Sequence, residues 1–160
     1  MAKDKTPVTP AVRLLRRLGI DFTPCLYAYQ DRGGTGRAAR ELGVDEHAVI
    51  KTLVMRDQDK RPLIVLMHGD REVSTKKLAR ALGLKSAAPC DPAEAQRHTG
   101  CQVGGISPFA TRKALPVYVQ ETILDMEEIY INAGKRGFLA RMSPADLSRA
   151  LRPAPVDAAQ

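Results

Sequence analysis

Two apolar segments near the middle of the chain constrain the fold more than any other feature. Along Val49–Met55 both faces of an alternating segment are largely apolar, and Lys51 and Thr52 are the polar exceptions. A strand that is apolar on both faces is typical of the centre of a sheet. The continuously apolar segment Leu63–Met67 follows the polar turn Asp57–Lys60, which predicts that the two strands pair. We therefore expect a fold built around these two central strands.

Helix-end signals and apolar segments predict a mixed set of further elements. Helices are predicted at residues 10–18, 36–42, 74–82 and 143–151, and strands at residues 22–29, 117–120, 128–132 and 138–142. Hairpins mixed with unequally placed helices predict an α/β protein of the α+β type, with a curved mixed sheet in one domain. Residues 153–160 contain Pro153 and Pro155 and are expected to form a disordered tail. Residues 1–8 are expected to form a flexible N-terminus.

Composition limits the class of protein and the class of partner. The chain has 160 residues, of which 44% are hydrophobic and 27% charged, enough for one ordered domain. Its three cysteines form no CxxC pair, and its three histidines lack ligand spacing, so neither a disulfide framework nor a metal site is expected. The sequence contains no hydrophobic signal core or membrane span, which predicts a cytoplasmic protein. A net charge of +7 favours a polyanionic partner.

Lys51 is the first candidate for binding or catalysis. It shares a strand face with Val49, Leu53 and Met55, where a lysine must reach the sheet edge or meet an anion. One interpretation is a cation held by a rigid strand at a pocket mouth, able to bind phosphate or polarise a carbonyl. The other is a lysine at a strand end with its ammonium group in water. The residue pattern leaves both open.

Two glycine-containing segments are candidates for binding the oxygen atoms of a ligand. In Gly104–Phe109 a pair of glycines precedes a proline, and such a loop can present backbone N–H groups to an oxyanion. In Gly134–Gly137 two cations, Lys135 and Arg136, stand between glycines, a pattern that suits a phosphate group. A tight strand connection and a solvated turn are the alternatives. Aromatic residues make up only 4%, which argues against an aromatic stacking platform for single-stranded RNA, so any RNA contact is expected through phosphates and a terminal nucleotide.

The segments Val49–Leu53, Gly104–Pro108 and Gly134–Gly137, in that order, resemble the YbaK family of free-standing aminoacyl-tRNA editing proteins. These proteins are similar to the editing domain inserted in bacterial prolyl-tRNA synthetases. Within the family the chain is most similar to the Cys-tRNA(Pro) deacylases. The resemblance implies an editing domain over residues 9–152, with a mostly antiparallel, barrel-like sheet of six or seven strands surrounded by helices. It also implies an enzyme that removes cysteine from proline tRNA, and from Cys-tRNA(Cys).

The resemblance assigns roles to particular residues. Lys51 and Gly105 take the positions of the catalytic lysine and of the loop glycine beside the scissile ester. The positions implied for substrate binding are Tyr27, Thr52, Gly104, Ile106, Ser107, Pro108, Lys135 and Arg136. The Tyr-Glu-His-Asp segment of many members reads Tyr-Ala-Tyr-Gln from Tyr27, and Leu139 replaces an aspartate that follows the Lys-Arg-Gly. Both departures leave room for a different substrate preference or a weaker activity.

The implied chemistry needs no nucleophile from the protein. The thiol of the substrate cysteine attacks its own ester carbonyl, which expels the tRNA 3′ end and leaves a cyclic thiolactone. Positioning carries most of this catalysis, the N–H of Gly105 stabilises the oxyanion, and Lys51 holds the terminal adenosine or its phosphate. No metal or organic cofactor is implied.

Two alternatives to this activity remain open. One is a deacylase for another small amino acid, such as alanine, that uses water. The other is a non-catalytic module that binds an RNA end or a synthetase. The partners that the resemblance implies are the acceptor end of an aminoacyl-tRNA and prolyl-tRNA synthetase.

Overall fold

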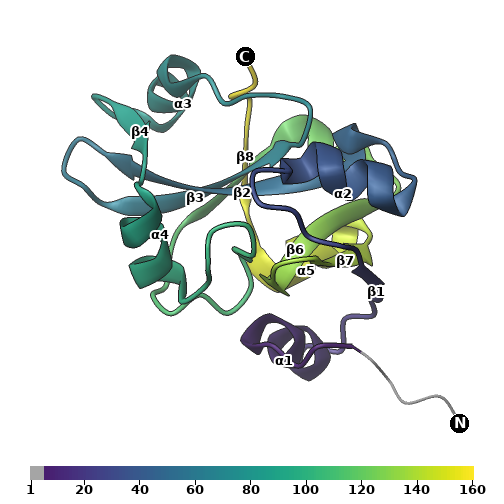
Figure 1. Ribbon diagram of the computed structural model, residues 1–160. Helices are drawn as coiled ribbons and strands as arrows, with labels where there is room; N and C mark the ends of the chain where they lie inside the picture. The colour runs from purple at the N-terminus through teal and green to yellow at the C-terminus, as the bar shows by residue number, and fades with distance from the viewer. Residues whose placement is uncertain (1–5) are drawn as a thin grey trace, which may run out of the picture.

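The computed structural model describes residues 6–160. Their strands form a single mixed sheet at the centre of the fold (Figure 1). Its strands are β1 (Thr23–Leu26), β2 (Val49–Asp57), β3 (Pro62–His68), β4 (Ala87–Pro89), β5 (Val117–Gln120), β6 (Ile129–Lys135), β7 (Phe138–Met142) and β8 (Ala154–Val156). The helices are α1 (Pro10–Arg17), α2 (Gly34–Leu42), α3 (Thr75–Leu82), α4 (Pro92–Thr99) and α5 (Pro144–Leu151), with the 3-10 helices η1 (Glu46–Ala48) and η2 (Glu121–Asp125). The flexible segment expected over residues 1–8 falls largely on residues outside the described part.

The central hairpin forms as its sequence pattern predicts. Strands β2 and β3 pair antiparallel, with Val54 opposite Ile64, and β2 also pairs with β4 and β6. The strand order is β1-β7-β6-β2-β3-β5-β8, with β4 outside this path. Within the described residues no ladder joins β1 to β8, so the sheet stays open. The predicted mixed α/β fold is confirmed, with eight strands in place of six or seven.

Local capping signals explain where the helices begin. The Thr9 side chain accepts a hydrogen bond from the Val12 N–H (3.1 Å) at the start of α1. Ser74 and Ser143 cap α3 and α5 in the same way, because a hydroxyl satisfies an N–H group that the first turn leaves unpaired. Helix α4 adds to the predicted helices, and Asp91 caps it with the same geometry. None of the helices in residues 6–160 has the length and hydrophobicity needed to cross a membrane.

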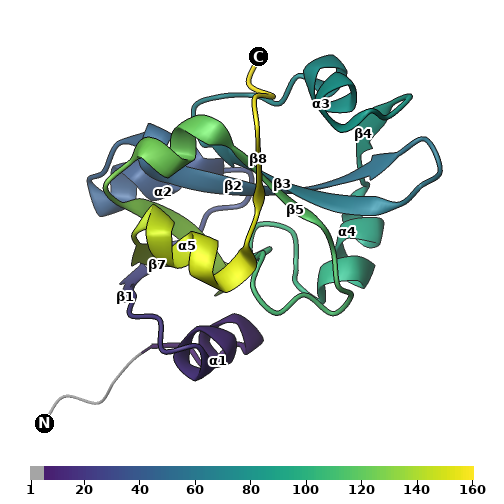
Figure 2. The same cartoon turned by 180° about the vertical axis from the view of Figure 1, so that it is seen from behind.

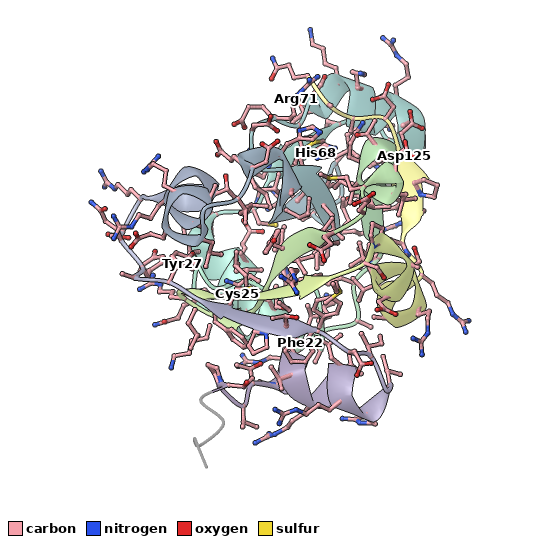
Figure 3. All side chains as sticks on the ribbon, turned by 90° about the vertical axis from the view of Figure 1, so that its right-hand side faces the viewer. Phe22, Cys25, Tyr27, His68, Arg71 and Asp125 are labelled. Atoms are coloured by element: carbon pink, nitrogen blue, oxygen red, sulfur yellow. The ribbon has the colours of Figure 1, made fainter. Side chains whose placement is uncertain are left out.

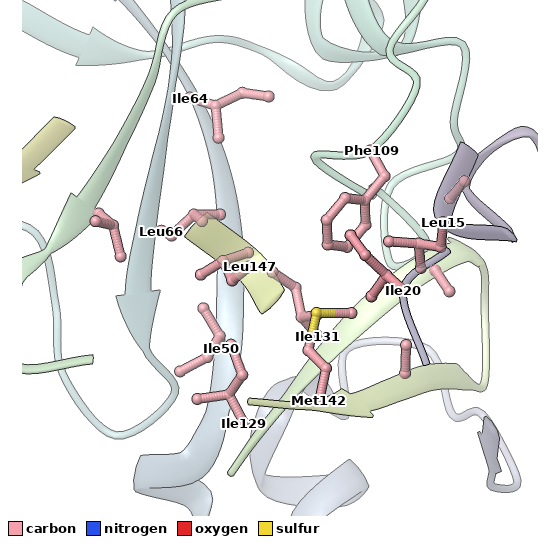
Figure 4. Close-up of a cluster of buried hydrophobic side chains, with 14 of the residues drawn as sticks. Leu15, Ile20, Ile50, Ile64, Leu66, Phe109, Ile129, Ile131, Met142 and Leu147 are labelled. Carbon is pink, nitrogen blue, oxygen red and sulfur yellow. The ribbon is translucent and has the colours of Figure 1, made fainter. Parts of the chain in front are cut away.

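Strand β3 divides the core into two clusters, because its successive side chains point to opposite faces. Ile64 and Leu66 join the larger cluster, where Phe109, Ile131 and Leu147 are also buried (Figure 4). The intervening side chains of β3 join a second cluster, whose buried members are Met55, Leu63, Val65, Met67, Leu78, Val156 and Ala158. Helices α2 and α5 lie on opposite sides of the sheet, as the front and back views show (Figures 1 and 2).

The residues after α5 form an ordered edge of the sheet, so the predicted disorder of residues 153–160 is wrong. Strand β8 pairs in parallel with β5, and beyond it Ala158 is completely buried. The Ser74 N–H donates to the Ala158 carbonyl (2.8 Å). The two prolines favoured disorder in the sequence analysis, but proline is accepted on an edge strand, where an outward N–H group is not needed.

We expect one substitution to have different effects at two alanines of this segment. Ala158→Glu places a charge at a fully buried position and should lower the free energy of unfolding by about 3 kcal/mol. Ala154→Glu changes an exposed position and should alter the same quantity by less than about 0.5 kcal/mol. Urea denaturation followed by circular dichroism measures both. Equal stability of the two variants would contradict an ordered tail.

Candidate active site

A cavity of about 600 Å³ opens beside β2. Its walls come from the segment between β1 and α2, from the first half of α2, from β2 itself, from the loop after β3, from the β4–α4 connection and from the loop after α4. Strands β6 and β7 contribute one side chain each, Asn132 and Leu139. Most of the lining is apolar, with a small number of polar and charged groups. This size and composition are typical of sites for small ligands.

Lys51 lies in the wall of this cavity. Its side chain is 18% exposed, and its Nζ is 3.2 Å from Oε1 of Glu72, on the loop that follows β3. The central strand fixes the backbone of the lysine, and the ion pair holds its ammonium group beside the cavity. Of the two interpretations of Lys51, the structure supports a cation in a pocket over a lysine at a strand end. Such a cation can polarise a carbonyl or bind a phosphate.

Thr52 and Tyr27, two of the predicted substrate-binding residues, also line the cavity. The Oγ1 of Thr52 is buried without a hydrogen-bond partner in residues 6–160, and a ligand can supply the bond that a buried hydroxyl requires. Tyr27 follows Cys25 along the segment that leaves β1 (Figure 3). Burial raises the pKa of the Tyr27 phenol, and the nearby Tyr29 raises it further. The phenol is therefore neutral near pH 7 and can donate a hydrogen bond.

The glycine-rich loop before Pro108 faces the cavity with only some of its residues. Gly104 and Ile106 line the cavity, and Gly105 does not. The N–H of Gly105 donates to the carbonyl of Gln102 (2.8 Å) and closes a turn. Gly104 has φ +92° in this turn, a conformation that favours glycine. In this structure the Gly105 N–H is used inside the loop, so its predicted donation to the substrate would require this turn hydrogen bond to break.

The donors that the loop leaves available are on either side of Gly105. The N–H groups of Gly104 and Ile106 donate to no acceptor within residues 6–160, and both residues line the cavity. A pair of backbone N–H groups in such a loop can stabilise a developing negative charge on oxygen.

Ser107 and Pro108 lie behind the loop, outside the cavity lining. Ser107 is completely buried, and its Oγ accepts a hydrogen bond from the N–H of Phe109 (3.2 Å). Pro108 is buried as well. Both residues turn toward the core, where Phe109 is packed, and their contact with the substrate stays a prediction.

The basic turn between β6 and β7 lies next to the glycine loop. The Nε of Arg136 donates to the carbonyl of Val103 (2.8 Å), and its guanidinium carbon is 5.1 Å from the centre of the Tyr29 ring. Val103 and Tyr29 line the cavity, whereas Lys135 and Arg136 are exposed and do not. The turn therefore joins two walls of the cavity, and its cations are accessible to an RNA phosphate.

Asn132 connects the two glycine-containing segments and is not among the site residues predicted from the sequence. Its side-chain amide donates to the carbonyls of Gly104 (3.4 Å) and Lys135 (3.2 Å), and its Oδ1 accepts from the N–H of Gly134 (2.7 Å). The available signal was a single amide in the otherwise apolar first half of β6. A buried amide of this kind needs hydrogen-bond partners and so indicates a polar site nearby.

Leu139 and Cys90 contribute an uncharged side chain and a neutral thiol to the cavity wall. Leu139, where the resemblance implies an aspartate in many relatives, is buried in a cluster with Val49 and Ala38, so this part of the wall is uncharged. Cys90 also lines the cavity, and burial and the nearby Glu94 raise the pKa of its thiol. The Cys90 thiol therefore stays protonated and is a weak nucleophile.

Two histidines that are distant in sequence stack on each other outside the cavity. The rings of His47 and His68 stack with their centres 3.6 Å apart. Asp70 binds Nδ1 of His47 (2.7 Å), and the Thr122 hydroxyl lies 2.7 Å from Nε2 of His68. Burial lowers the pKa of His68. In the described part of the chain, no group of three or more His, Cys, Asp or Glu side chains could hold a metal ion.

The chain is similar in sequence to proteins of known family. The model of the family described as "Aminoacyl-tRNA editing domain" matches residues 34–150. An Enterococcus faecalis protein named "Putative Cys-tRNA(Pro)/Cys-tRNA(Cys) deacylase EbsC" is 30% identical over 146 residues, which are 90% of this chain and 89% of that protein. A proline–tRNA ligase of Stenotrophomonas maltophilia is 26% identical over 141 residues, which are 86% of this chain and 23% of the ligase.

Solved structures have the same fold. The crystal structure of a "putative trans-editing enzyme for prolyl tRNA synthetase" matches with a TM-score of 0.83 and 21% identity, over 96% of this chain and 99% of the other. A hypothetical protein matches with a TM-score of 0.87 and 22% identity, over 95% of this chain and 100% of the other. At these identities the likeness concerns the fold.

Proposed function

Because this chain belongs to the aminoacyl-tRNA editing domain family, we propose that it is a trans-acting deacylase that removes cysteine from Cys-tRNA(Pro), and from Cys-tRNA(Cys). The name of its Enterococcus faecalis relative, which aligns with nine-tenths of the chain, supports this substrate class. The observation that carries the proposal is the position of Lys51. It is the cation of a central strand, held in the wall of a largely apolar cavity of about 600 Å³.

The reaction proceeds by attack of the substrate's own thiol. The sulfur forms a bond to the ester carbonyl carbon, the ester C–O bond breaks, and the thiol proton passes to the leaving 3′ oxygen. A thiolactone and free tRNA result. Bringing thiol and carbonyl into one conformer accounts for most of the rate gain, because intramolecular attack depends mainly on orientation. The neutral Cys90 thiol takes no part.

The protein contributes positive potential and hydrogen-bond donors. The ammonium group of Lys51 polarises the ester carbonyl or binds the adjoining phosphate. The N–H groups of Gly104 and Ile106 stabilise the oxyanion in place of Gly105. The unpartnered hydroxyl of Thr52 binds a polar atom of the terminal nucleotide or of the ester.

The partners follow from the charge and the size of the domain. A net charge of +7 favours the RNA acceptor end, and the exposed Lys135 and Arg136 contact its phosphates. A domain of this size offers little surface to distinguish whole tRNAs, so we propose that prolyl-tRNA synthetase recruits it. The likeness to a segment of proline–tRNA ligases supports this partner. The place of action is the cytoplasm, where aminoacyl-tRNA is used.

The test is deacylation by the purified protein of Cys-tRNA(Pro), Cys-tRNA(Cys), Ala-tRNA(Pro) and Ser-tRNA(Pro), with and without the synthetase. We expect cleavage of both cysteine esters, little cleavage of the alanine and serine esters, and faster turnover of Cys-tRNA(Pro) when the synthetase is present. Serine is the matched control, because its hydroxyl has the place of the thiol but is a much weaker nucleophile.

Two results would overturn the proposal. Cleavage of alanine and cysteine esters at similar rates would indicate a water-dependent deacylase for small amino acids. Binding of Cys-tRNA(Pro) without turnover would indicate a non-catalytic module.

A further inference from the structure

An aminoacyl ester carries an α-ammonium group next to its carbonyl, and an editing cavity must accommodate that charge. Moving an ammonium group out of water is costly unless an anion accompanies it. The acidic residues in the lining of the cavity are Asp31 and Glu72. These two carboxylates are therefore the anionic candidates for binding the ammonium group.

The position of Glu72 favours it over Asp31. Its Oε1 is 3.2 Å from the Nζ of Lys51, so its carboxylate lies beside the cation that is proposed to act on the ester. In the substrate the ammonium nitrogen and the carbonyl carbon are attached to the same α-carbon, so their binding groups must also be neighbours. Asp31 lies on an exposed turn, and the ion pair of Lys51 is made with Glu72 and not with Asp31.

The Glu72 carboxylate also has capacity for a second cation. A carboxylate has about four acceptor positions on its two oxygens. Oε1 of Glu72 accepts one hydrogen bond from Lys51, and Oε2 accepts none within the described residues. The side chain is 79% exposed, so an incoming ligand can reach it without breaking the ion pair.

The backbone of Glu72 is held in place by the last residues of the chain. Its carbonyl accepts a hydrogen bond from the N–H of Gln160 (2.9 Å), and the neighbouring Val73 forms a bridge with Ala159. A guanidinium nitrogen of Arg71 donates to the Gln160 carbonyl (3.1 Å). The loop after β3 is thus fixed on both sides of Glu72, and a fixed backbone is what a binding group of defined position requires.

We propose that Glu72 binds the α-ammonium group of the aminoacyl ester and so makes the site selective for a free amino acid on the tRNA. This inference rests on the proposed deacylase function. Lys51 keeps its ion pair with Oε1, and the substrate ammonium occupies Oε2. A peptidyl or N-blocked ester, which lacks this cation, is bound less well.

The test compares Cys-tRNA(Pro) with 3-mercaptopropionyl-tRNA(Pro), which keeps the ester and the thiol and lacks only the amino group. Single-turnover rates are divided by the uncatalysed rates, because the amino group also affects the intrinsic reactivity of the ester. We expect the wild type to favour Cys-tRNA(Pro) by tenfold or more on this scale, about the strength of one charged hydrogen bond. Glu72→Gln should reduce the preference to about twofold, mainly by slowing cleavage of Cys-tRNA(Pro).

Asp31→Asn is the matched control, because it removes the same charge from the same cavity and should keep the preference for Cys-tRNA(Pro). Equal slowing of both substrates by Glu72→Gln would assign Glu72 only to the placement of Lys51 and overturn the inference. A wild type that cleaves both substrates equally would do the same. If the wild type cleaves neither, the proposed function itself fails, so the two failures are distinguishable.

Discussion

Replacing Lys51 with methionine is expected to remove most of the deacylase activity and leave the fold intact. Methionine keeps an unbranched apolar stem beside β2 and removes the ammonium group. The remaining partner, Glu72, is 79% exposed, so it is not left as a buried unpaired charge. The free energy of unfolding should therefore change by no more than about 1 kcal/mol. The single-turnover rate on Cys-tRNA(Pro) should fall by roughly a hundredfold or more, the scale of a lost electrostatic contact to the transition state.

Two further variants distinguish the role of the Lys51 ammonium group in the cavity from the effect of lowering the net charge of the protein. Lys85→Ala removes the same charge from an exposed position outside the cavity lining, and its turnover should stay near that of the wild type. Lys51→Arg should restore only part of the activity, because a wider planar group changes the reach from a fixed strand position. Near-normal turnover by Lys51→Met would show that Lys51 has no part in catalysis or substrate binding.

Gly105→Ala is expected to lower both the stability of the domain and the turnover per folded molecule. A Cβ at this position would lie 2.7 Å from the backbone nitrogen of Arg136 and 2.9 Å from the carbonyl carbon of Lys135. Because both neighbours are backbone atoms, the glycine loop and the basic turn must move apart. Such overpacking costs about 1–3 kcal/mol of unfolding free energy. The shift also displaces Gly104 and Ile106, so we expect a rate loss of roughly tenfold to a hundredfold.

Gly36→Ala is the control for this substitution. Its Cβ would meet the flexible end of Arg40 at 3.4 Å inside helix α2, where alanine should raise the free energy of unfolding by about 0.5 kcal/mol. Thermal melting and single-turnover kinetics on the same preparations measure both effects. A Gly105→Ala protein with normal stability and normal chemistry would contradict the close contact of the two loops. Lower stability with normal chemistry would leave Gly105 a purely structural position.

Several features of the fold were predictable because their signals are local. A cap residue such as Thr9 or Ser143 satisfies N–H groups within its own helical turn, so the sequence around it contains the whole interaction. The central hairpin was predictable for a similar reason, since β2 and β3 are adjacent in sequence and apolar. The confirmed family resemblance likewise rests on three short segments. Asp91 and the proline after it carried the same kind of signal for α4, which was not predicted.

The end of the chain shows where local signals fail. The segment that contains Pro155 has little tendency to order by itself, and it is ordered because β5 offers a free edge and Ala158 fills a space beside α3. Neither partner is near it in sequence. The strand order, including the parallel pairing of β2 with β6, is likewise set by contacts between distant segments.

The sequence by itself determined most of the helices and strands of this protein, the central strand that carries Lys51, the family, and the segments from which the site is made. Only the tertiary structure decided which atoms of those segments reach the cavity. It placed the Gly105 N–H inside a turn and Ser107 behind the loop. It also brought Glu72 and Asn132 to the site. The physical reason is that residue type and spacing record what a segment can do, whereas the direction of each donor and acceptor depends on which partner in the folded chain satisfies it, a neighbour in the turn for Gly105 and a distant segment for Glu72 and Asn132.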